Sequence, residues 1–105
     1  MMRKIILPLI LIGFVLIASP AQAANGGQIF QANCAVCHAN GGNRIMVNKT
    51  LQKDVLAKYN MDSKEAIVQQ IINGKNAMPN FRGRLNSSQI EAVADYVLSK
   101  AEQGW

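Results

Sequence analysis

The stretch Cys34-Ala35-Val36-Cys37-His38 organises the rest of the chain. On a helix the cysteines are three positions apart and the histidine is four from the first cysteine, so all three side chains share one face. In the C-x-x-C-H arrangement, two thiols can add across the vinyl groups of a haem while the imidazole binds the iron. The motif therefore predicts one covalently attached haem c held by Cys34 and Cys37, with His38 as an axial ligand.

A C-x-x-C pair also serves as a redox dithiol or as half of a zinc site. Zinc is disfavoured because the chain contains only two cysteines and one histidine, and no second cysteine pair exists. A thioredoxin-like dithiol follows a strand in a βαβ pattern, which the chain does not show. A haem-free dithiol exchanger stays an alternative, and a covalent haem mass on the purified protein would eliminate it.

The first 23 residues have the three-part layout of a secretory signal. Two positive charges precede an apolar run from Ile5 to Ile17, and Ala21-Gln22-Ala23 is a small-x-small cleavage site. The apolar run is shorter than the roughly 20 residues needed to span a bilayer. We therefore expect export, cleavage after Ala23, a mature domain of residues 24–105, and no membrane insertion of that domain.

The charge of the chain argues against binding to nucleic acid. The formal net charge is +5, and loss of Arg3 and Lys4 with the signal leaves nine basic against six acidic residues, or +3. This bias is weak and contains no dense basic run. Its expected use is to steer short-lived encounters with a protein partner. A domain this small buries little core by itself, so a haem would supply an apolar body to fold around.

Apolar periodicity predicts an all-α domain, because no run alternates convincingly as a strand. The expected helices span residues 26–37, 51–59, 62–73 and 86–102. Side chains that could cap their first turns are Asn25, Asp62 with Glu65, and Asn86 with Gln89. Phe30 and the terminal Trp105 are expected to be packing residues.

The second axial position separates electron transfer from catalysis. No second histidine exists, and a lysine is possible but must lose its proton to bind, which leaves the thioethers of Met46, Met61 and Met78 in the mature chain. Met46 follows His38 too closely to reach the opposite haem face, whereas spacing does not exclude Met61. Met78 is preferred because it lies in a non-helical loop far from His38 and precedes Pro79. His/Met ligation predicts a one-electron carrier that is not an enzyme; the alternative is a small haem peroxidase, or a gas or redox sensor, with a dissociable Met78.

Several motifs in combination closely resemble the cytochrome c6 family. They are residues 34–43, 49–51, 73–79, 81–85 and the ending Gly104-Trp105. The resemblance implies a four-helix class I cytochrome c fold around one haem, with His38 and Met78 as axial ligands. It also implies a carrier in the thylakoid lumen, or a periplasm, that takes electrons from the cytochrome b6f complex and passes them to photosystem I or to a terminal oxidase. We expect it to act as a monomer.

Further positions in these motifs are candidates for the haem environment or for docking. Arg84 matches an arginine that the family uses near its docking face, Arg82 stands where lysine is frequent, and Lys75 opens the Met78 loop. Immediately before the Asn-Gly pair, where photosynthetic members commonly carry glutamine, this chain has Ile72. Since hydrocarbon would replace a polar group near the haem, the resemblance predicts a lower reduction potential than in glutamine-bearing members, and doubtful donation to photosystem I.

Overall fold

The computed structural model describes residues 25–105, so the expected signal sequence lies outside the described part of the chain. The helices are α2 (Gly26–Asn33), α3 (Ala35–His38), η1 (Ala39–Gly41, a 3-10 helix), α4 (Lys53–Lys58), α5 (Lys64–Asn73) and α6 (Ser87–Gln103). Residues 25–105 contain no strand, only an isolated bridge between Lys75 and Met78. The prediction of an all-α domain is confirmed.

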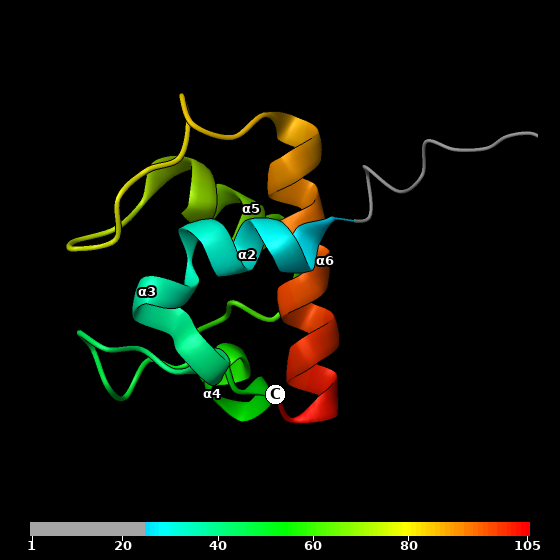
Figure 1. The fold of residues 1–105 in the computed structure, drawn as a ribbon. Helices are drawn as coiled ribbons and strands as arrows, with labels where there is room; N and C mark the ends of the chain where they lie inside the picture. Colours follow the sequence, from blue (N-terminus) through cyan, green and yellow to red (C-terminus); the bar gives the residue numbers. More distant parts are fainter. Residues whose placement is uncertain (1–24) are drawn as a thin grey trace, which may run out of the picture.

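The long helix α6 is the element against which α2, α4 and α5 pack (Figure 1). Helix α2 crosses α6 at Gly26, where a Cβ would lie 2.1 Å from the backbone oxygen of Ala92. Such a close approach leaves room for a hydrogen atom only, so glycine is required at the crossing. The buried core between the helices consists of Phe30, Leu56, Ile67, Ile71, Phe81, Ile90, Val93, Ala94, Val97 and Ala101.

Phe30 lies at the centre of this core, with 1% of its surface exposed. Its ring centroid is 5.3 Å from that of Tyr96 and 5.4 Å from that of Trp105, both in tilted arrangements. Aromatic pairs in this geometry stabilise a core beyond the area that they bury. The prediction that Phe30 and Trp105 are packing residues is confirmed.

The expectation of one unbroken helix over residues 26–37 is wrong, because the chain turns at Cys34 (φ −118°, ψ −29°). The side-chain amide of Asn33 donates to the carbonyl oxygen of Ile29 at 3.0 Å, and the last helical bond of α2 runs from the amide of Cys34 to the carbonyl of Phe30 at 2.8 Å. The amide N–H groups of Cys37 and His38 then both donate to the carbonyl of Cys34. A second short helix, α3, therefore begins at Ala35, with the first cysteine of the motif as its N-cap residue.

The predicted caps have mixed outcomes. Asn86 and Gln89 form the expected capping box at the start of α6. The box predicted at Asp62 is wrong, since the hydroxyl of Ser63 caps α5 instead. Asn25 occupies the N-cap position of α2, but its side chain makes no capping hydrogen bond. Asp62 and Ser63 are both good cap residues, and only the direction of the backbone decides which one reaches the helix.

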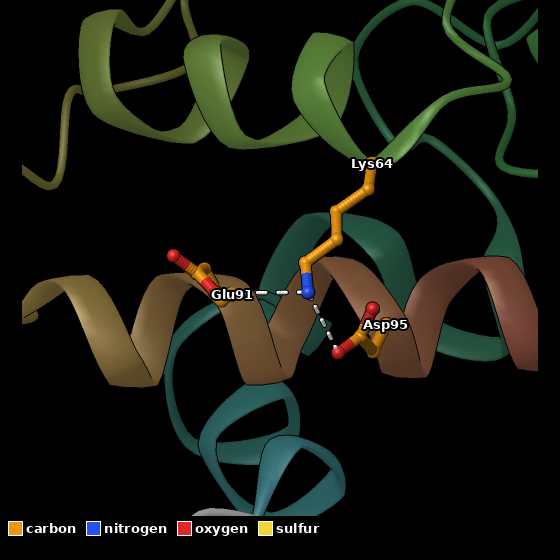
Figure 2. A network of polar contacts seen from close by, with 3 residues as sticks. All are labelled: Lys64, Glu91 and Asp95. Atoms are coloured by element: carbon orange, nitrogen blue, oxygen red, sulfur yellow. Dashed lines mark hydrogen bonds and ion pairs between the residues drawn. The ribbon is translucent and has the colours of Figure 1, made fainter.

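Lys64 links α5 to α6 at the surface (Figure 2). Its Nζ lies 3.2 Å from Oδ2 of Asp95 and 3.6 Å from Oε1 of Glu91. The hydrogen bond to Asp95, together with the charges of both carboxylates, raises the pKa of Lys64. Water screens such exposed ion pairs strongly. Burial of Ile67 and Ile71, more than this ion pair, therefore holds α5 on α6.

Candidate haem-binding site

Cys34 lies between α2 and α3, and Cys37 lies within α3. The amide of Cys37 donates to the carbonyl of Cys34 at 3.1 Å, which keeps the two residues within one turn. Both thiols are free and half-buried. Burial raises the pKa of the Cys34 thiol from 9.0 to about 11, so this thiol is protonated at neutral pH in the folded chain.

His38 ends α3, and a backbone carbonyl holds its ring. Nδ1 lies 2.9 Å from the carbonyl oxygen of Gly42. A carbonyl oxygen can only accept, so Nδ1 carries the proton and Nε2 keeps its lone pair for a metal. Within residues 25–105, no cluster of three or more His, Cys, Asp or Glu could bind a metal ion. An imidazole with a free Nε2 lone pair is the donor that an axial haem ligand needs.

The loop that carries this carbonyl is organised by Asn43, which the sequence did not single out as a site residue. Its Nδ2 donates to the carbonyl of Lys49 at 2.9 Å, and its Oδ1 accepts from the amide of Met46 at 2.8 Å. The side chain of Met46 is 43% exposed. The loop next to Gly42 is thus held by hydrogen bonds between the Asn43 side chain and the backbone, not by a helix or a strand.

Met78 lies in a tight turn after α5. Lys75 and Met78 exchange two backbone hydrogen bonds of 3.0 and 2.9 Å. The turn begins at Gly74 (φ +69°), where a Cβ would come 2.6 Å from the carbonyl oxygen of Met78, so a larger residue does not fit. In Figure 1 this turn (yellow) and α3 project to the same side of α6. The Met78 side chain is half-buried and packs against the core.

Gln70 was not among the predicted site residues, yet its Nε2 lies 3.7 Å from Sδ of Met78. Ile72, the position singled out for its lack of an amide, is half-buried against the core. Gln70 thus supplies an amide at the predicted sulfur ligand from a different position, and the lower potential expected from Ile72 stays a prediction. The contact forms because the turn after α5 brings the sulfur back over the end of the helix, and no local pattern indicates that.

The three basic docking candidates lie on the segment around Met78 and are exposed. Nη2 of Arg82 donates to Oδ1 of Asn73 at 2.6 Å. The guanidinium of Arg84 lies 5.1 Å from the ring centroid of the buried Phe81. Lys75 belongs to the turn itself. The fold thus places all three on the chain segment that presents the predicted sulfur ligand.

The donor atoms and the partly exposed apolar side chains of the domain suit a haem. Several apolar or sulfur-bearing side chains pack against the core but stay partly exposed: Cys34, Ala35, Met61, Val68, Ile72 and Met78. A flat apolar group can cover such a surface. Two thiols, an imidazole with a free Nε2 and a thioether are the donor set of haem c. This donor set on an all-helical domain defines a c-type cytochrome.

Sequence similarity to known proteins identifies the family of cytochromes. The profile of the family described as cytochrome C oxidase, cbb3-type, subunit III matches residues 21–97. The chain is 54% identical to cytochrome c6 of Porphyra purpurea over 94 residues, which cover 90% of this chain and 86% of that protein. It is also 54% identical to cytochrome c6 of Nostoc sp., in an alignment that covers 97% of this chain and 98% of that protein.

Cytochrome c6 of the diatom Phaeodactylum tricornutum has a similar structure, with a TM-score of 0.76 and 50% identity, covering 79% of this chain and 98% of that one. The chain belongs to the cytochrome c6 family. It is a class I cytochrome c of photosynthetic electron transport with one covalently bound haem c, as the sequence predicted. Over residues 25–105, none of the helices has the length and apolar character needed to cross a membrane.

Proposed function

We propose that the chain carries single electrons from the cytochrome b6f complex to photosystem I, or to a terminal oxidase, through a haem held by Cys34, Cys37, His38 and Met78. The haem iron supplies the one-electron couple. The observation that carries the proposal is the 2.9 Å hydrogen bond from His38 to Gly42, because it directs the lone pair of the other ring nitrogen to the metal. Cytochrome c6 relatives at 54% identity support electron carriage.

In this proposal the two cysteines hold the haem through thioether bonds. Thiolate is the reactive form of cysteine. Because burial raises the pKa of Cys34 to about 11, the folded chain contains little of that form at neutral pH. This favours attachment before the chain folds, which fits delivery of an unfolded, exported chain. We accordingly propose cleavage after Ala23 and a monomeric mature domain, residues 24–105, in the thylakoid lumen.

The axial ligands are suited to rapid electron transfer because the backbone holds both. The Gly42 carbonyl orients His38, and the paired hydrogen bonds of Lys75 and Met78 fix the turn that carries the sulfur. A thioether favours ferrous over ferric iron. The amide of Gln70 donates to the same sulfur and draws electron density from it, which favours the ferrous state further.

The partners are expected to present acidic surfaces to this chain. Lys75, Arg82 and Arg84 are exposed around the Met78 turn, and the interactions of the two arginines with Asn73 and Phe81 limit their motion. Exposed charges at the edge of an interface chiefly change the rate of association and its salt dependence. Substituting Arg84 by glutamine should therefore slow the reduction of photosystem I at low ionic strength and have little effect at high ionic strength.

Visible spectroscopy and redox titration of the holoprotein test the ligands. Met78→Ala should abolish the ferric sulfur-to-iron absorption band and lower the midpoint potential. Met61→Ala and Met46→Ala are matched controls, since each removes one thioether from the same domain, and both should keep the band. Loss of the band in Met61→Ala alone, or a colourless wild-type protein, would refute the proposed site.

Carbon monoxide binding separates electron carriage from the peroxidase or sensor alternative. A sixth ligand that stays bound blocks access to the iron, so the ferrous wild-type protein should bind carbon monoxide slowly at neutral pH. Met78→Ala should bind it rapidly and serves as the positive control. Rapid binding by the wild-type protein would favour the alternative with a dissociable Met78.

A further inference from the structure

Trp105, the last residue, lies against the loop that holds His38. Gly104 adopts a left-handed conformation (φ +86°) and turns the chain back at the end of α6, where the amide of Trp105 donates to the carbonyl of Lys100 at 2.8 Å. The indole Nε1 then donates to the carbonyl of Leu51 at 2.8 Å, a contact between residues 54 positions apart. The end of the chain is thus attached to the loop that follows α3 and η1.

The indole ring also covers Gly41. A Cβ at this position would lie only 2.4–2.6 Å from three atoms of the Trp105 ring. The carbonyl of Gly41 accepts the amide of Leu51 at 2.7 Å, which joins the two ends of the 41–51 loop. Trp105 therefore contacts the loop at both ends, through its ring at Gly41 and through its N–H group at Leu51.

Gly42, the next residue, supplies the carbonyl that accepts the hydrogen bond from His38 Nδ1. Two consecutive glycines have wide conformational freedom, and the φ of Gly41 is +76°. The amide of Gly42 donates to the carbonyl oxygen of Ala39 at 3.0 Å, and a Cβ at Gly42 would approach no other atom within 4 Å, so Gly42 has little further packing of its own. The buried contact of Gly41 with Trp105 is thus a second restraint, beside the bond to Ala39, on where the acceptor for His38 lies.

We propose that Trp105 is a positioning residue for the axial histidine. Its indole holds Gly41, Gly41 holds the carbonyl of Gly42, and that carbonyl sets the strength of the hydrogen bond from Nδ1 of His38. The inference rests on the proposed ligation of the iron by His38. A hydrogen bond at Nδ1 makes the imidazole a stronger donor and stabilises ferric iron. Loss of the indole therefore weakens this bond and raises the reduction potential.

The test compares the wild-type holoprotein with Trp105→Leu, Trp105→Phe and Asn86→Ala. Leucine removes the aromatic ring, whereas phenylalanine keeps a ring over Gly41 and loses only the N–H group. Asn86→Ala removes the cap at the opposite end of the same helix, so it lowers stability without touching the loop. Two quantities are measured: the midpoint potential, and the exchange rate of the His38 Nδ1 proton in the NMR spectrum.

We expect the potential to increase from wild type to Trp105→Phe to Trp105→Leu, with Asn86→Ala equal to wild type. Exchange of the Nδ1 proton should accelerate roughly tenfold in Trp105→Leu, as for a weakened hydrogen bond. Unchanged potential and exchange in the tryptophan variants would overturn the inference, as would an equal change in Asn86→Ala. If Trp105→Leu does not fold, the midpoint potential and the Nδ1 exchange rate of Trp105→Phe, compared with those of wild type and Asn86→Ala, decide whether Trp105 positions His38.

A separate measurement shows whether His38 binds the iron at all. An iron-bound imidazole gives the His38 ring protons large paramagnetic shifts in the ferric wild-type protein. If those shifts are absent, His38 is not a ligand and the proposed function fails at this residue. If they are present and the tryptophan variants behave as wild type, the ligation stands and only the role of Trp105 is refuted.

Discussion

Replacement of Gly26 by alanine would test how closely α2 and α6 are packed. The added Cβ would lie 2.1 Å from the carbonyl oxygen and 2.7 Å from the carbonyl carbon of Ala92. Non-bonded heavy atoms attract at about 3.5–4.0 Å and repel well inside that distance. Both atoms belong to the backbone of α6, so no side-chain rotation can relieve the clash. The two helices would have to separate by roughly 1 Å.

The cost of this separation should exceed the gain in helix propensity. Overpacking of a core costs about 1–3 kcal/mol, and alanine regains at most about 1 kcal/mol relative to glycine in a helix. Because the clash is with backbone, we expect the upper part of the first range and a net loss of about 2 kcal/mol. In a domain of this size, that loss lowers the Tm by roughly 8–16 °C.

Gly27→Ala is the matched control, since it changes the neighbouring residue in the same turn. Its Cβ would lie 3.0 Å from Cε1 of Tyr96, the outer part of a side chain that can shift. We expect its stability to stay within about 1 kcal/mol of wild type. Thermal and guanidinium unfolding of the holoproteins, followed by circular dichroism, would measure both variants. A Gly26→Ala protein that melts with wild type, or no lower than Gly27→Ala, would refute the backbone-contact argument.

Three further predictions concern the ligand environment, the core and the surface. Gln70→Leu should lower the midpoint potential because the sulfur of Met78 loses its hydrogen-bond donor, whereas Ile72→Val should leave it unchanged; redox titration of both checks this. Phe30→Ala should cost about 3–5 kcal/mol in guanidinium unfolding, since it empties the centre of the core. The pKa of Lys64 is raised on folding, so its stabilising effect is present below its ordinary pKa and is lost as the pH rises through the higher value. Lys64→Met should therefore destabilise equally across neutral pH and less in high salt, with the potential unchanged.

Much of the helical structure was predictable because apolar residues that recur at three and four positions must share one face. Helices α5 and α6 fall within one or two residues of the expected ranges, while α4 is shorter. The break at Cys34 was not predictable, because the spacing of Phe30, Cys34 and Cys37 fits one continuous helix and does not record the φ of −118° at Cys34. Local spacing shows which residues share a face of a helix, but not where the backbone leaves helical geometry.

The sequence by itself determined the chemistry of attachment, since two thiols and an imidazole at C-x-x-C-H spacing need no distant residue to lie near one another. Only the tertiary structure decided what surrounds the predicted ligands: Gln70 beside the sulfur of Met78, and Trp105 over the glycine next to the acceptor of His38. These contacts join segments whose separation in space depends on turns at Gly74 and Gly104. A turn's direction follows from the packing of whole helices, and no pattern within a single segment specifies it.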